Sequence, residues 1–581
     1  MLILLPPKLP LVAPLGVLIV GNKINIYCGS AVFKHCVSIS FMTERVKLIK
    51  TGPTTMALKD RHDNQVANFV IREDLEKALV LLKKINNLRA VDGAPIYKTR
   101  LYNGISTWSF HQHSLYLPAL SEFIKYDEVM EFFYRAGAKY EVEASHELTE
   151  LVGYMEASGV RIIKSFLPLV SLKKTAAKLM KIAAASLAFF ESLVACVKLI
   201  VFRPTVLVYS PDKLDPRSRS DFRVSAVYDY LREQHVPYIE IVHTLFGREF
   251  MKNIWERKRL VIYKELFTWG DWLEKNSFKN YDLSSIEERH RKVVTLLINE
   301  VDKSSRKSVR FIKNFSRLLK LAKVKLFVSL DDMRHVQEII CACRSNGVKS
   351  YGFQHGHITK FHAGWMNYEI PKNYCVTFDK LFVWNDYWKK ALLEHSSCYD
   401  ESNVEAGGEL RPPPEIHYQQ RTNPPAKISD LCLLIPYESI APKDEIKPYI
   451  KRLKDKGARL IFKLRPDVSA ESQLNEYGLS GSDAEVVSRL NSDVLARVDA
   501  AVGVYTTFLY EMIFYEKPVF ILRTSFALGL SLVEDEVASE LREDFSESDI
   551  LDAIKNFQGK KRIAWPVAPR LKDTLRKVIS L

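Results

Sequence analysis

The stretch that decides the fold runs from Val324 to His357 and reads VKLFVSLDDMRHVQEIICACRSNGVKSYGFQHGH. Its apolar pattern predicts a buried strand over 324–329, a helix over 333–344 and a second buried strand over 348–353. A unit this compact is typical of a right-handed βαβ crossover between parallel strands. The sequence therefore predicts an α/β fold built on a parallel sheet.

Polar residues follow both of these strands. Asp331 and Asp332 come after the first strand, and Gln354, His355 and Gly356 come after the second. In open parallel sheets, ligands bind at the edge where the strands end. A glycine there lets the backbone approach a ligand, and an imidazole carries a proton or donates to a phosphate. Either aspartate is a candidate general base toward a hydroxyl group. The alternatives are that the aspartate caps the following helix and that His355 has only a structural role.

A second α/β series begins after the proline-rich linker 412–425. The predicted strands cover 431–435, 459–463, 500–504 and 519–522, and the predicted helices cover 445–456 and 488–498. Arg465 follows the second of these strands. The chain therefore predicts two Rossmann-like domains facing across a cleft, accompanied by amphipathic helices.

A candidate phosphate site follows the strand 500–504. Tyr505, Thr506 and Thr507 open a helix that carries Glu511 about one turn later. The N–H groups and the positive dipole end of a helix attract phosphate, and a glutamate at that distance accepts hydrogen bonds from a ribose. The alternative is a capping threonine with a buried, paired glutamate.

Length and charge limit the classes of function. At 581 residues the chain exceeds one ordinary core, and its net charge of +15 favours anionic partners. Zinc-finger spacing, an RNP-like pattern and a helix-turn-helix are all absent from the sequence, so no nucleic-acid partner is expected. The eight cysteines form no CxxC pair, which favours a reduced intracellular compartment. His111 and His113 alternate on a strand-like stretch, too weak a pattern for a metal site, and no metal is expected.

Two helical segments are unusual. Residues 171–203 predict a long amphipathic helix, which either packs in the core or lies in a membrane interface; Glu191 and Lys198 argue against a membrane-spanning helix. Residues 304–325 predict a helix with a cationic stripe that either attracts anionic lipid or a polyanionic acceptor, or is an ordinary solvated face. The stripe comprises Arg306, Arg310, Lys313, Arg317 and Lys320.

The apolar N-terminus is interrupted by prolines and lacks the features of an export signal, and Gly16 to Tyr27 predicts a buried first strand. The expected organisation is a mixed α/β N-terminal region, the amphipathic helix, a Rossmann-like domain, a linker, a second Rossmann-like domain and a C-terminal helix. These parts cover residues 1–170, 171–203, 204–411, 412–425, 426–565 and 566–581.

Four segments in order carry a resemblance to a known group: Gly352 to Gly356, Val404 to Arg411 (VEAGGELR), Lys463 to Pro466, and Gly503 to Val519 (GVYTTFLYEMIFYEKPV). Over roughly 204–522 the chain resembles the bacterial GT-B glycosyltransferases of surface-polysaccharide assembly. These include capsule Kdo transferases, bacterial sialyltransferases and teichoic acid polymerases.

The resemblance implies that His355 lies in the interdomain cleft. It also implies that residues 1–170 and 204–411 form the acceptor side and that the donor nucleotide-sugar is held on the opposite domain, residues 426–565. The implied donor-binding residues are Gln354, Gly356, Arg411, Arg465, Tyr505, Thr506, Thr507 and Glu511. The chain departs from several relatives in having Arg465-Pro466 in place of a His-Pro pair, and Thr-Thr in place of Ser-Ser.

The implied reaction is attack of an acceptor hydroxyl on an anomeric carbon, with His355, Arg465 and the threonine turn stabilising the leaving phosphate. Asp331 or Asp332 would be the base, without metal or cofactor. The expected partners are a nucleotide-sugar, a lipid-linked or polysaccharide acceptor and an anionic membrane surface, at the inner face of the cytoplasmic membrane. The alternatives are a nucleotide-sugar epimerase of the same fold and a non-catalytic subunit of a polysaccharide assembly complex.

Overall fold

A computed structural model gives the fold. It describes residues 2–4, 15–20, 23–28, 44–52, 55–71, 73–144, 148–163, 172–210, 214, 221–242, 253, 260–268, 279–330, 334–411, 413–419, 425–465, 469–559 and 571–579. The chain divides into two compact units. The first comprises residues 1–71 and 126–169, and the second comprises residues 72–125 and 170–581.

The first unit contains a five-stranded sheet in the order β10-β9-β4-β5-β6. Its strands are β4 (Glu44–Gly52), β5 (Thr55–Lys59), β6 (Gln65–Val70), β9 (Tyr140–Ala144) and β10 (Arg161–Ile163). The helices α4 (Asp127–Ala136) and α5 (Thr149–Ala157) belong to the same unit. Residues of β9 alternate between buried and half-buried, as expected for a strand with one face on a core.

Three short N-terminal strands form a separate antiparallel sheet: β1 (Leu2–Leu4), β2 (Leu15–Val20) and β3 (Lys23–Cys28). The prediction of one strand from Gly16 to Tyr27 is wrong. The two halves of that stretch pair with each other, from Leu15 opposite Cys28 to Val20 opposite Lys23. The Gly21-Asn22 pair at the centre is a strong hairpin-turn signal, which the apolar pattern on either side obscured.

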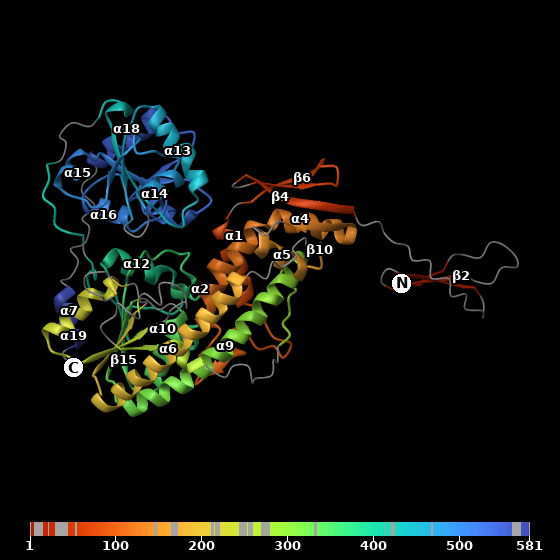
Figure 1. Ribbon diagram of the computed structural model, residues 1–581, viewed down its shortest axis with the longest axis horizontal. Helices are drawn as coiled ribbons and strands as arrows, with labels where there is room; N and C mark the ends of the chain where they lie inside the picture. The colour runs from red at the N-terminus through yellow and green to blue at the C-terminus, as the bar shows by residue number, and fades with distance from the viewer. Residues whose placement is uncertain are drawn as a thin grey trace. The chain divides into compact units, whose positions relative to one another are not determined.

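The second unit contains a seven-stranded parallel sheet in the order β13-β12-β11-β14-β15-β16-β17 (Figure 1). The strands are β11 (Val206–Ser210), β12 (Tyr238–Val242), β13 (Val261–Tyr263), β14 (Leu326–Leu330), β15 (Lys349–Phe353), β16 (Lys380–Val383) and β17 (Val404–Ala406). Two strands, β12 and β13, are added to one side of β11, and the chain then crosses to the other side. This is the doubly wound order of Rossmann-like folds, with its switch point between β11 and β14.

A second parallel sheet in the same unit, with six strands, has the same doubly wound design. Its order is β20-β19-β18-β21-β22-β23, again with every pair parallel. The strands are β18 (Cys432–Pro436), β19 (Arg459–Lys463), β20 (Glu485–Val487), β21 (Ala500–Gly503), β22 (Val519–Leu522) and β23 (Ser539–Leu541). The switch point here lies between β18 and β21. The molecule therefore has two Rossmann-like domains, which confirms the predicted fold class.

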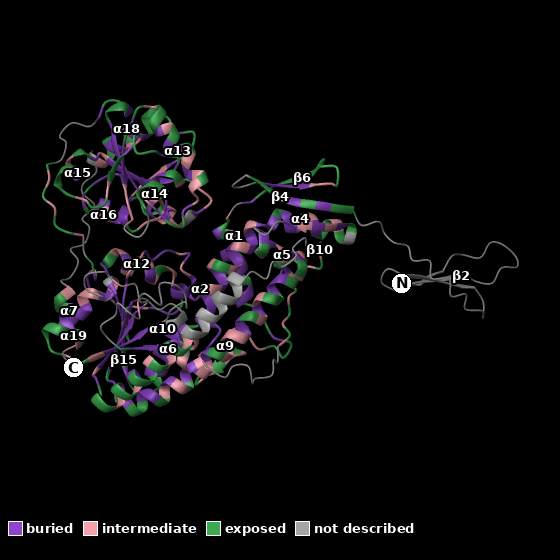
Figure 2. Ribbon diagram, viewed as in Figure 1, coloured by how far each residue is buried: buried purple, intermediate pink, exposed green. Residues whose placement is uncertain are grey.

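Each of the two parallel sheets is a buried layer between helices (Figure 2). In the first Rossmann-like domain, which contains the sheet β11–β17, Val206 and Val208 of β11 pack with Leu231 of α7 (Ser225–Glu233) and with Leu575 of α19 (Leu571–Ile579). In the second domain, the core joins the sheet to α13 (Lys443–Asp455) and α18 (Glu547–Gly559). The C-terminal helix α19 thus returns to the first domain, where Thr574 donates a hydrogen bond to the carbonyl of Gly407 (2.8 Å).

Two long helices flank the first domain side by side, α6 (Leu172–Phe202) and α9 (Glu288–Ala322) (Figure 1). The helix α6 runs along the edge strand β13. There the hydroxyl of Ser192 accepts a hydrogen bond from the N–H of Tyr263 (2.9 Å), and Glu191 accepts one from the N–H of Val261 (3.2 Å). The helix therefore occupies donors that an uncovered edge strand would expose.

Three local predictions differ from the structure. The stretch 102–123 is mostly helical from Ser109 onward, so His111 and His113 lie on consecutive helical turns instead of one strand. The helix predicted over 488–498 is α15 (Ser492–Arg497), preceded by the short edge strand β20. The helix α9 begins 16 residues before the predicted position 304. In each case long-range contacts, which the local sequence pattern does not contain, decide the secondary structure.

Candidate functional site

The carboxyl edge of the second sheet is built around Glu438, which follows β18 at the switch point. This side chain is buried (2% exposed) and accepts three backbone hydrogen bonds. The donors are the N–H groups of Val504 (2.7 Å), Tyr505 (2.7 Å) and Thr506 (2.6 Å). Burial raises the pKa of Glu438, and the three N–H groups oppose this by favouring the carboxylate. Glu438 thus holds the turn that connects β21 to the next helix.

This contact changes the interpretation of the predicted phosphate cradle. The N–H groups of Tyr505 and Thr506 already bond a protein carboxylate. Thr506 is half-buried and Thr507 is exposed at the start of α16 (Phe508–Phe514). The Thr506 hydroxyl accepts a hydrogen bond from the N–H of Phe508 (3.4 Å), and the side chain of Thr507 is the exposed one. Binding of a nucleotide by these threonines stays a prediction.

Arg465 lies at the end of β19, beside this turn. Its guanidinium donates to the hydroxyl of Ser439 (2.7 Å), which follows Glu438 in the chain. The Gln473 side chain clamps the Arg465 backbone at both ends, accepting from its N–H (2.8 Å) and donating to its carbonyl (2.8 Å). Burial raises the pKa of Tyr505, whose hydroxyl accepts from the N–H of Ile440 (3.4 Å). Two of the predicted donor-binding residues therefore surround the switch point, where ligands of such sheets bind.

Four charged residues from both domains form a cluster: Glu409 and Arg411 follow β17, Lys463 ends β19, and Glu511 lies on α16. Burial, and then the Glu511 carboxylate, raise the pKa of Glu409 to about 7. Burial raises the pKa of Glu511, while Lys463 and Arg411 lower it. Burial lowers the pKa of Lys463, which Glu511 opposes. A carboxyl group that titrates near neutral pH inside a charged site is suited to general acid–base catalysis.

The position of Glu409 depends on the two glycines before it. A Cβ atom at Gly407 would lie 2.7 Å from the Cβ of Phe382, and Gly408 has a φ of +86°. Only glycine adopts both arrangements without strain. The chain can therefore turn sharply after β17 and place Glu409 next to Glu511.

The predicted Gln354-His355-Gly356 element follows β15, as expected. Gln354 is buried and its amide is bonded at both ends: it accepts from the N–H of Trp384 (2.9 Å) and donates to the carbonyl of Gly356 (2.8 Å). Gln354 therefore shapes the loop. A Cβ atom at Gly356 would meet open space, and His355 is half-buried. The roles of His355 and Gly356 toward a ligand stay predictions.

His357, two residues on, lies in an aromatic contact between the domains. Its ring lies 4.0 Å from that of Tyr510 on α16 and 5.7 Å from that of Trp388 on α12 (Asp386–His395). Burial lowers the pKa of His357 far below its usual range, and His362 adds to this. A neutral, packed imidazole serves the interface here. Lys360 and Glu534 form an ion pair between the same domains (3.1 Å).

Asp331 and Asp332, the predicted bases, lie outside the described residues. Within the described ranges no group of three or more potential metal-ligating side chains occurs. His111 is buried in helical structure. Two site residues were not identified from the sequence, Glu409 and Glu438. Both follow the end of a strand, which is the signal that selected His355 and Arg465.

Comparison with known proteins adds the following. No family model matches the chain, and no curated protein matches it. The solved structures it is similar to include MurG from Acinetobacter baumannii (10% identity, TM-score 0.38, covering 65% of this chain and 100% of that one). A second is the calicheamicin glycosyltransferase CalG4 (12% identity, TM-score 0.36, covering 65% of this chain and 93% of that one). A third is the UDP-GlcNAc 2-epimerase of Methanocaldococcus jannaschii (11% identity, TM-score 0.35, covering 64% of this chain and 98% of that one).

These TM-scores lie below 0.5, so the class is defined by the strand orders and the position of the site. Two doubly wound parallel sheets contribute residues to one charged site, and His357 of the first Rossmann-like domain contacts Tyr510 of the second. This is an α/β protein with two Rossmann-like domains.

Proposed function

We propose that this protein is a metal-independent glycosyltransferase that moves a sugar from a nucleotide-sugar to an acceptor hydroxyl. The observation that carries the proposal is the cluster of Glu409, Arg411, Lys463 and Glu511, which lie after strands β17 and β19 and on helix α16 of two Rossmann-like domains. Such domains bind nucleotides at these edges. A carboxyl group with a raised pKa and nearby cations supplies the chemistry of the transfer.

In this proposal Glu409 takes the proton from the acceptor hydroxyl as that oxygen attacks the anomeric carbon. Its pKa of about 7 leaves a large fraction ionised at neutral pH, and the same pKa makes it a stronger base than an exposed glutamate. Asp331 and Asp332 remain the alternative bases. Arg465, Lys463 and the threonine turn stabilise the negative charge that develops on the leaving nucleotide. Glu511 accepts hydrogen bonds from the ribose.

Nucleotide binding tests this assignment directly. A nucleotide at about 100 times its Kd stabilises the native state by about 2.7 kcal/mol, which corresponds to a rise in Tm of about 5–10 °C for a domain of this size. One of CMP, UDP, GDP and TDP is expected to produce this shift, and Glu511→Ala is expected to reduce it. Glu476→Ala, a partly exposed glutamate of the same domain, is the control. If none of the four nucleotides shifts the Tm, the site assignment is wrong.

We further propose that the protein lies on the inner face of the cytoplasmic membrane and takes a lipid-linked or polysaccharide acceptor. Among the described residues, one helical stretch, Ala184–Phe202, is long and apolar enough to cross a membrane; its mean hydropathy is 2.0 and 22% of it is buried. Its inner face, including Ala188 and Leu199, is buried. Its outer face is apolar and exposed: the exposed fractions of Leu187, Phe190, Val194, Val197 and Val201 are 44–66%.

A helix bound to β13 by Ser192 on one side, with an apolar stripe on the other, is typical of attachment in the plane of a membrane interface. Phe190→Ser with Val197→Ser is expected to weaken partitioning onto vesicles with about 30 mol % phosphatidylglycerol by about tenfold to 100-fold, because each buried apolar side chain contributes about 1.5 kcal/mol or more.

The matched control is Val80→Ser with Val91→Ser, two exposed valines of the same unit that should leave partitioning unchanged. Equal partitioning of all three proteins would contradict attachment through α6. Self-association that the Phe190 and Val197 substitutions abolish without lipid would assign the stripe to a contact between copies of the chain.

A further inference from the structure

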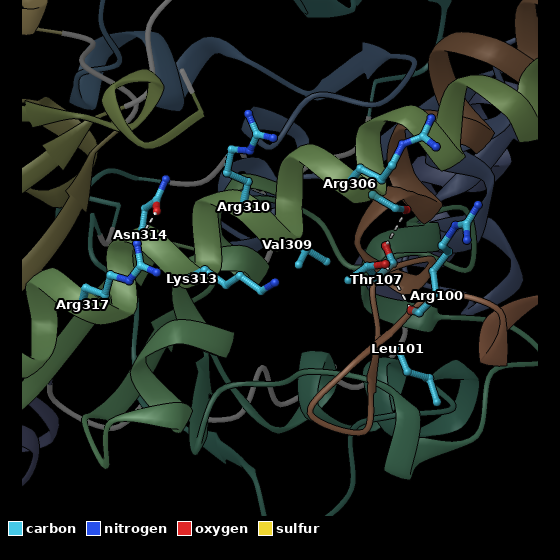
Figure 3. A pocket seen from close by; sticks show the side chains of 10 residues that line it. Arg100, Leu101, Thr107, Arg306, Val309, Arg310, Lys313, Asn314 and Arg317 are labelled. Atoms are coloured by element: carbon cyan, nitrogen blue, oxygen red, sulfur yellow. Dashed lines mark hydrogen bonds between the residues drawn. The ribbon is translucent and has the colours of Figure 1, made fainter. Parts of the chain in front are cut away.

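A cationic pocket lies on α9, between this helix and the hairpin of β7 (Leu101–Tyr102) and β8 (Ile105–Ser106) (Figure 3). Its volume is about 220 Å³. The cationic side chains that line it are Arg100, Arg306, Arg310, Lys313 and Arg317. Four of the five residues of the predicted stripe therefore line one pocket together with an arginine from a distant part of the sequence, and Lys320 lies outside the lining.

The four α9 cations are spaced by four, three and four residues, which places them on one face of the helix. Like charges at these spacings destabilise a helix. Arg100 stands at one end of the row, where the fully buried Asp302 pairs with its guanidinium (3.4 Å). The pocket thus gathers five cations, one of them held in place by a buried carboxylate. Such a concentration of positive charge is stabilised when anions bind to it.

We propose that this pocket is a second ligand site, which binds a group carrying two or more adjacent phosphates. Arginine is suited to this because its planar guanidinium bonds phosphate oxygens in pairs. From Arg306 to Arg317 the row is about 16 Å long, more than a single phosphate can contact. The pocket is smaller than the clefts of about 300–1,000 Å³ that enclose drug-sized ligands. A compact polyphosphate group therefore fits it better than a whole nucleotide-sugar.

The neutral lining residues hold the pocket in shape. Thr107 donates a hydrogen bond to the carbonyl of Arg100 (3.1 Å), and Ser305 donates to the carbonyl of Thr107 (3.5 Å). The Asn314 amide donates to the carbonyl of Phe267 (3.0 Å), and its oxygen accepts from Arg317 (3.4 Å), which orients that guanidinium along the helix (Figure 3). The cationic side chains therefore supply the contacts to the phosphates.

This inference goes beyond the proposed function, since the pocket belongs to the first domain and is separate from the switch point of the second sheet. Two sources have the required chemistry, the head group of a phosphorylated lipid and a soluble diphosphate. The helix α6 packs against α9, so a phosphorylated head group at the membrane surface and a soluble ligand are both compatible with the position of the pocket.

The experiment uses the full-length protein and two probes, inorganic pyrophosphate in calorimetry and vesicles of phosphatidylcholine with or without a lipid that carries a diphosphate head group, diacylglycerol diphosphate. Arg310→Gln with Arg317→Gln removes two pocket cations, and Lys313→Gln with Arg317→Gln is a second pair. The matched control is Lys320→Gln with Lys323→Gln, which removes the same charge from α9 outside the pocket. Both pocket pairs are expected to weaken binding at least about tenfold, and the control pair less than about twofold.

The two probes distinguish the sources. Loss of pyrophosphate binding with unchanged vesicle binding assigns the pocket to a soluble diphosphate. Loss of vesicle binding that depends on diacylglycerol diphosphate, with pyrophosphate as a competitor, assigns it to a lipid head group. Equal losses in pocket and control pairs, or no binding of either probe by the unaltered protein, overturn the proposal. Nucleotide-induced stabilisation should persist in both pocket pairs, so failure here is separable from failure of the proposed function.

Discussion

Replacement of Glu409 by glutamine is expected to lower kcat for sugar transfer by about 10²- to 10⁴-fold, the range that general acid–base groups contribute. Glutamine keeps the shape of the side chain and removes its ability to accept a proton. The Tm shift produced by the nucleotide should be retained, because Glu409 acts on the acceptor. The measurement is the initial rate of nucleotide release in the presence of acceptor.

The pH dependence gives a second readout of the same residue. Because the pKa of Glu409 is about 7, the rate in the unaltered protein should rise as pH increases through 7, and this rise should disappear in Glu409→Gln. The folded pKa lies above the ordinary value of 4.5, so the folded state binds the proton more tightly than the unfolded state. The free energy of unfolding should therefore fall by about 3 kcal/mol as pH rises from below 4.5 to above 7.

Glu409→Gln should remove this loss, so the variant should be inactive yet more stable than the unaltered protein at pH 8. The matched control is Glu415→Gln, an exposed glutamate six residues further along. Its rate and stability should not change. A Glu409→Gln variant with full activity, or with an unaltered slope of stability against pH, would exclude Glu409 as the base.

Replacement of Glu438 by alanine is expected to destabilise the second Rossmann-like domain by about 3–5 kcal/mol. The substitution leaves the N–H groups of Val504, Tyr505 and Thr506 without their acceptor in a buried site, and each unsatisfied group costs about 1–3 kcal/mol before relaxation. Glu438→Gln keeps one acceptor oxygen and should cost about half as much. Urea unfolding of the full chain, followed through the second domain, measures both values.

Glu476 provides the comparison. It accepts one hydrogen bond from Tyr437 (2.9 Å) and is 39% exposed, so Glu476→Ala should cost less than about 1 kcal/mol. Equal stabilities for Glu438→Ala and Glu476→Ala would mean that the turn after β21 does not depend on Glu438. Nucleotide binding should be lost in Glu438→Ala even at temperatures where the domain stays folded, because the turn loses its shape.

The parallel sheets were predictable from the sequence because both faces of each sheet are buried. Strands that are buried on both faces are short, continuous apolar runs, which the sequence shows directly. The strands β19 and β22 begin and end at the predicted residues, and β14 and β15 differ from prediction by one or two residues. The edge strand β20 was missed because it has only three residues and is largely exposed, so its two valines form no long apolar run.

The candidate site was predictable only in part. Arg465, Tyr505 and His355 follow strands, and strand ends can be located from the apolar pattern alone. Glu438 could not be assigned, because its partners lie 66 to 68 residues away and are backbone N–H groups that no residue type reveals. The raised pKa of Glu409 depends on burial and on Glu511 from the other domain. Both are properties of the folded chain.

The cationic pocket on α9 was also predictable only in part. The spacing of Arg306, Arg310, Lys313 and Arg317 predicts their common face on α9, and the structure has it. The predicted alternatives were a lipid-facing stripe, an acceptor-binding stripe and a solvated face. The pocket required Arg100 and the β7–β8 hairpin, which lie about 200 residues earlier in the chain and were not associated with the stripe.

The most direct test of the central claim is mass spectrometry of both products after incubation with the nucleotide-sugar whose nucleotide gives the Tm shift, together with a lipid-linked glycan acceptor. Sugar transfer predicts that the acceptor gains the mass of one sugar for each free nucleotide released, and that Glu409→Gln and Glu511→Ala abolish both signals. Conversion of the nucleotide-sugar into an isomer, with no gain of mass in the acceptor, would contradict sugar transfer and identify an epimerase. No change in either compound would indicate a non-catalytic protein.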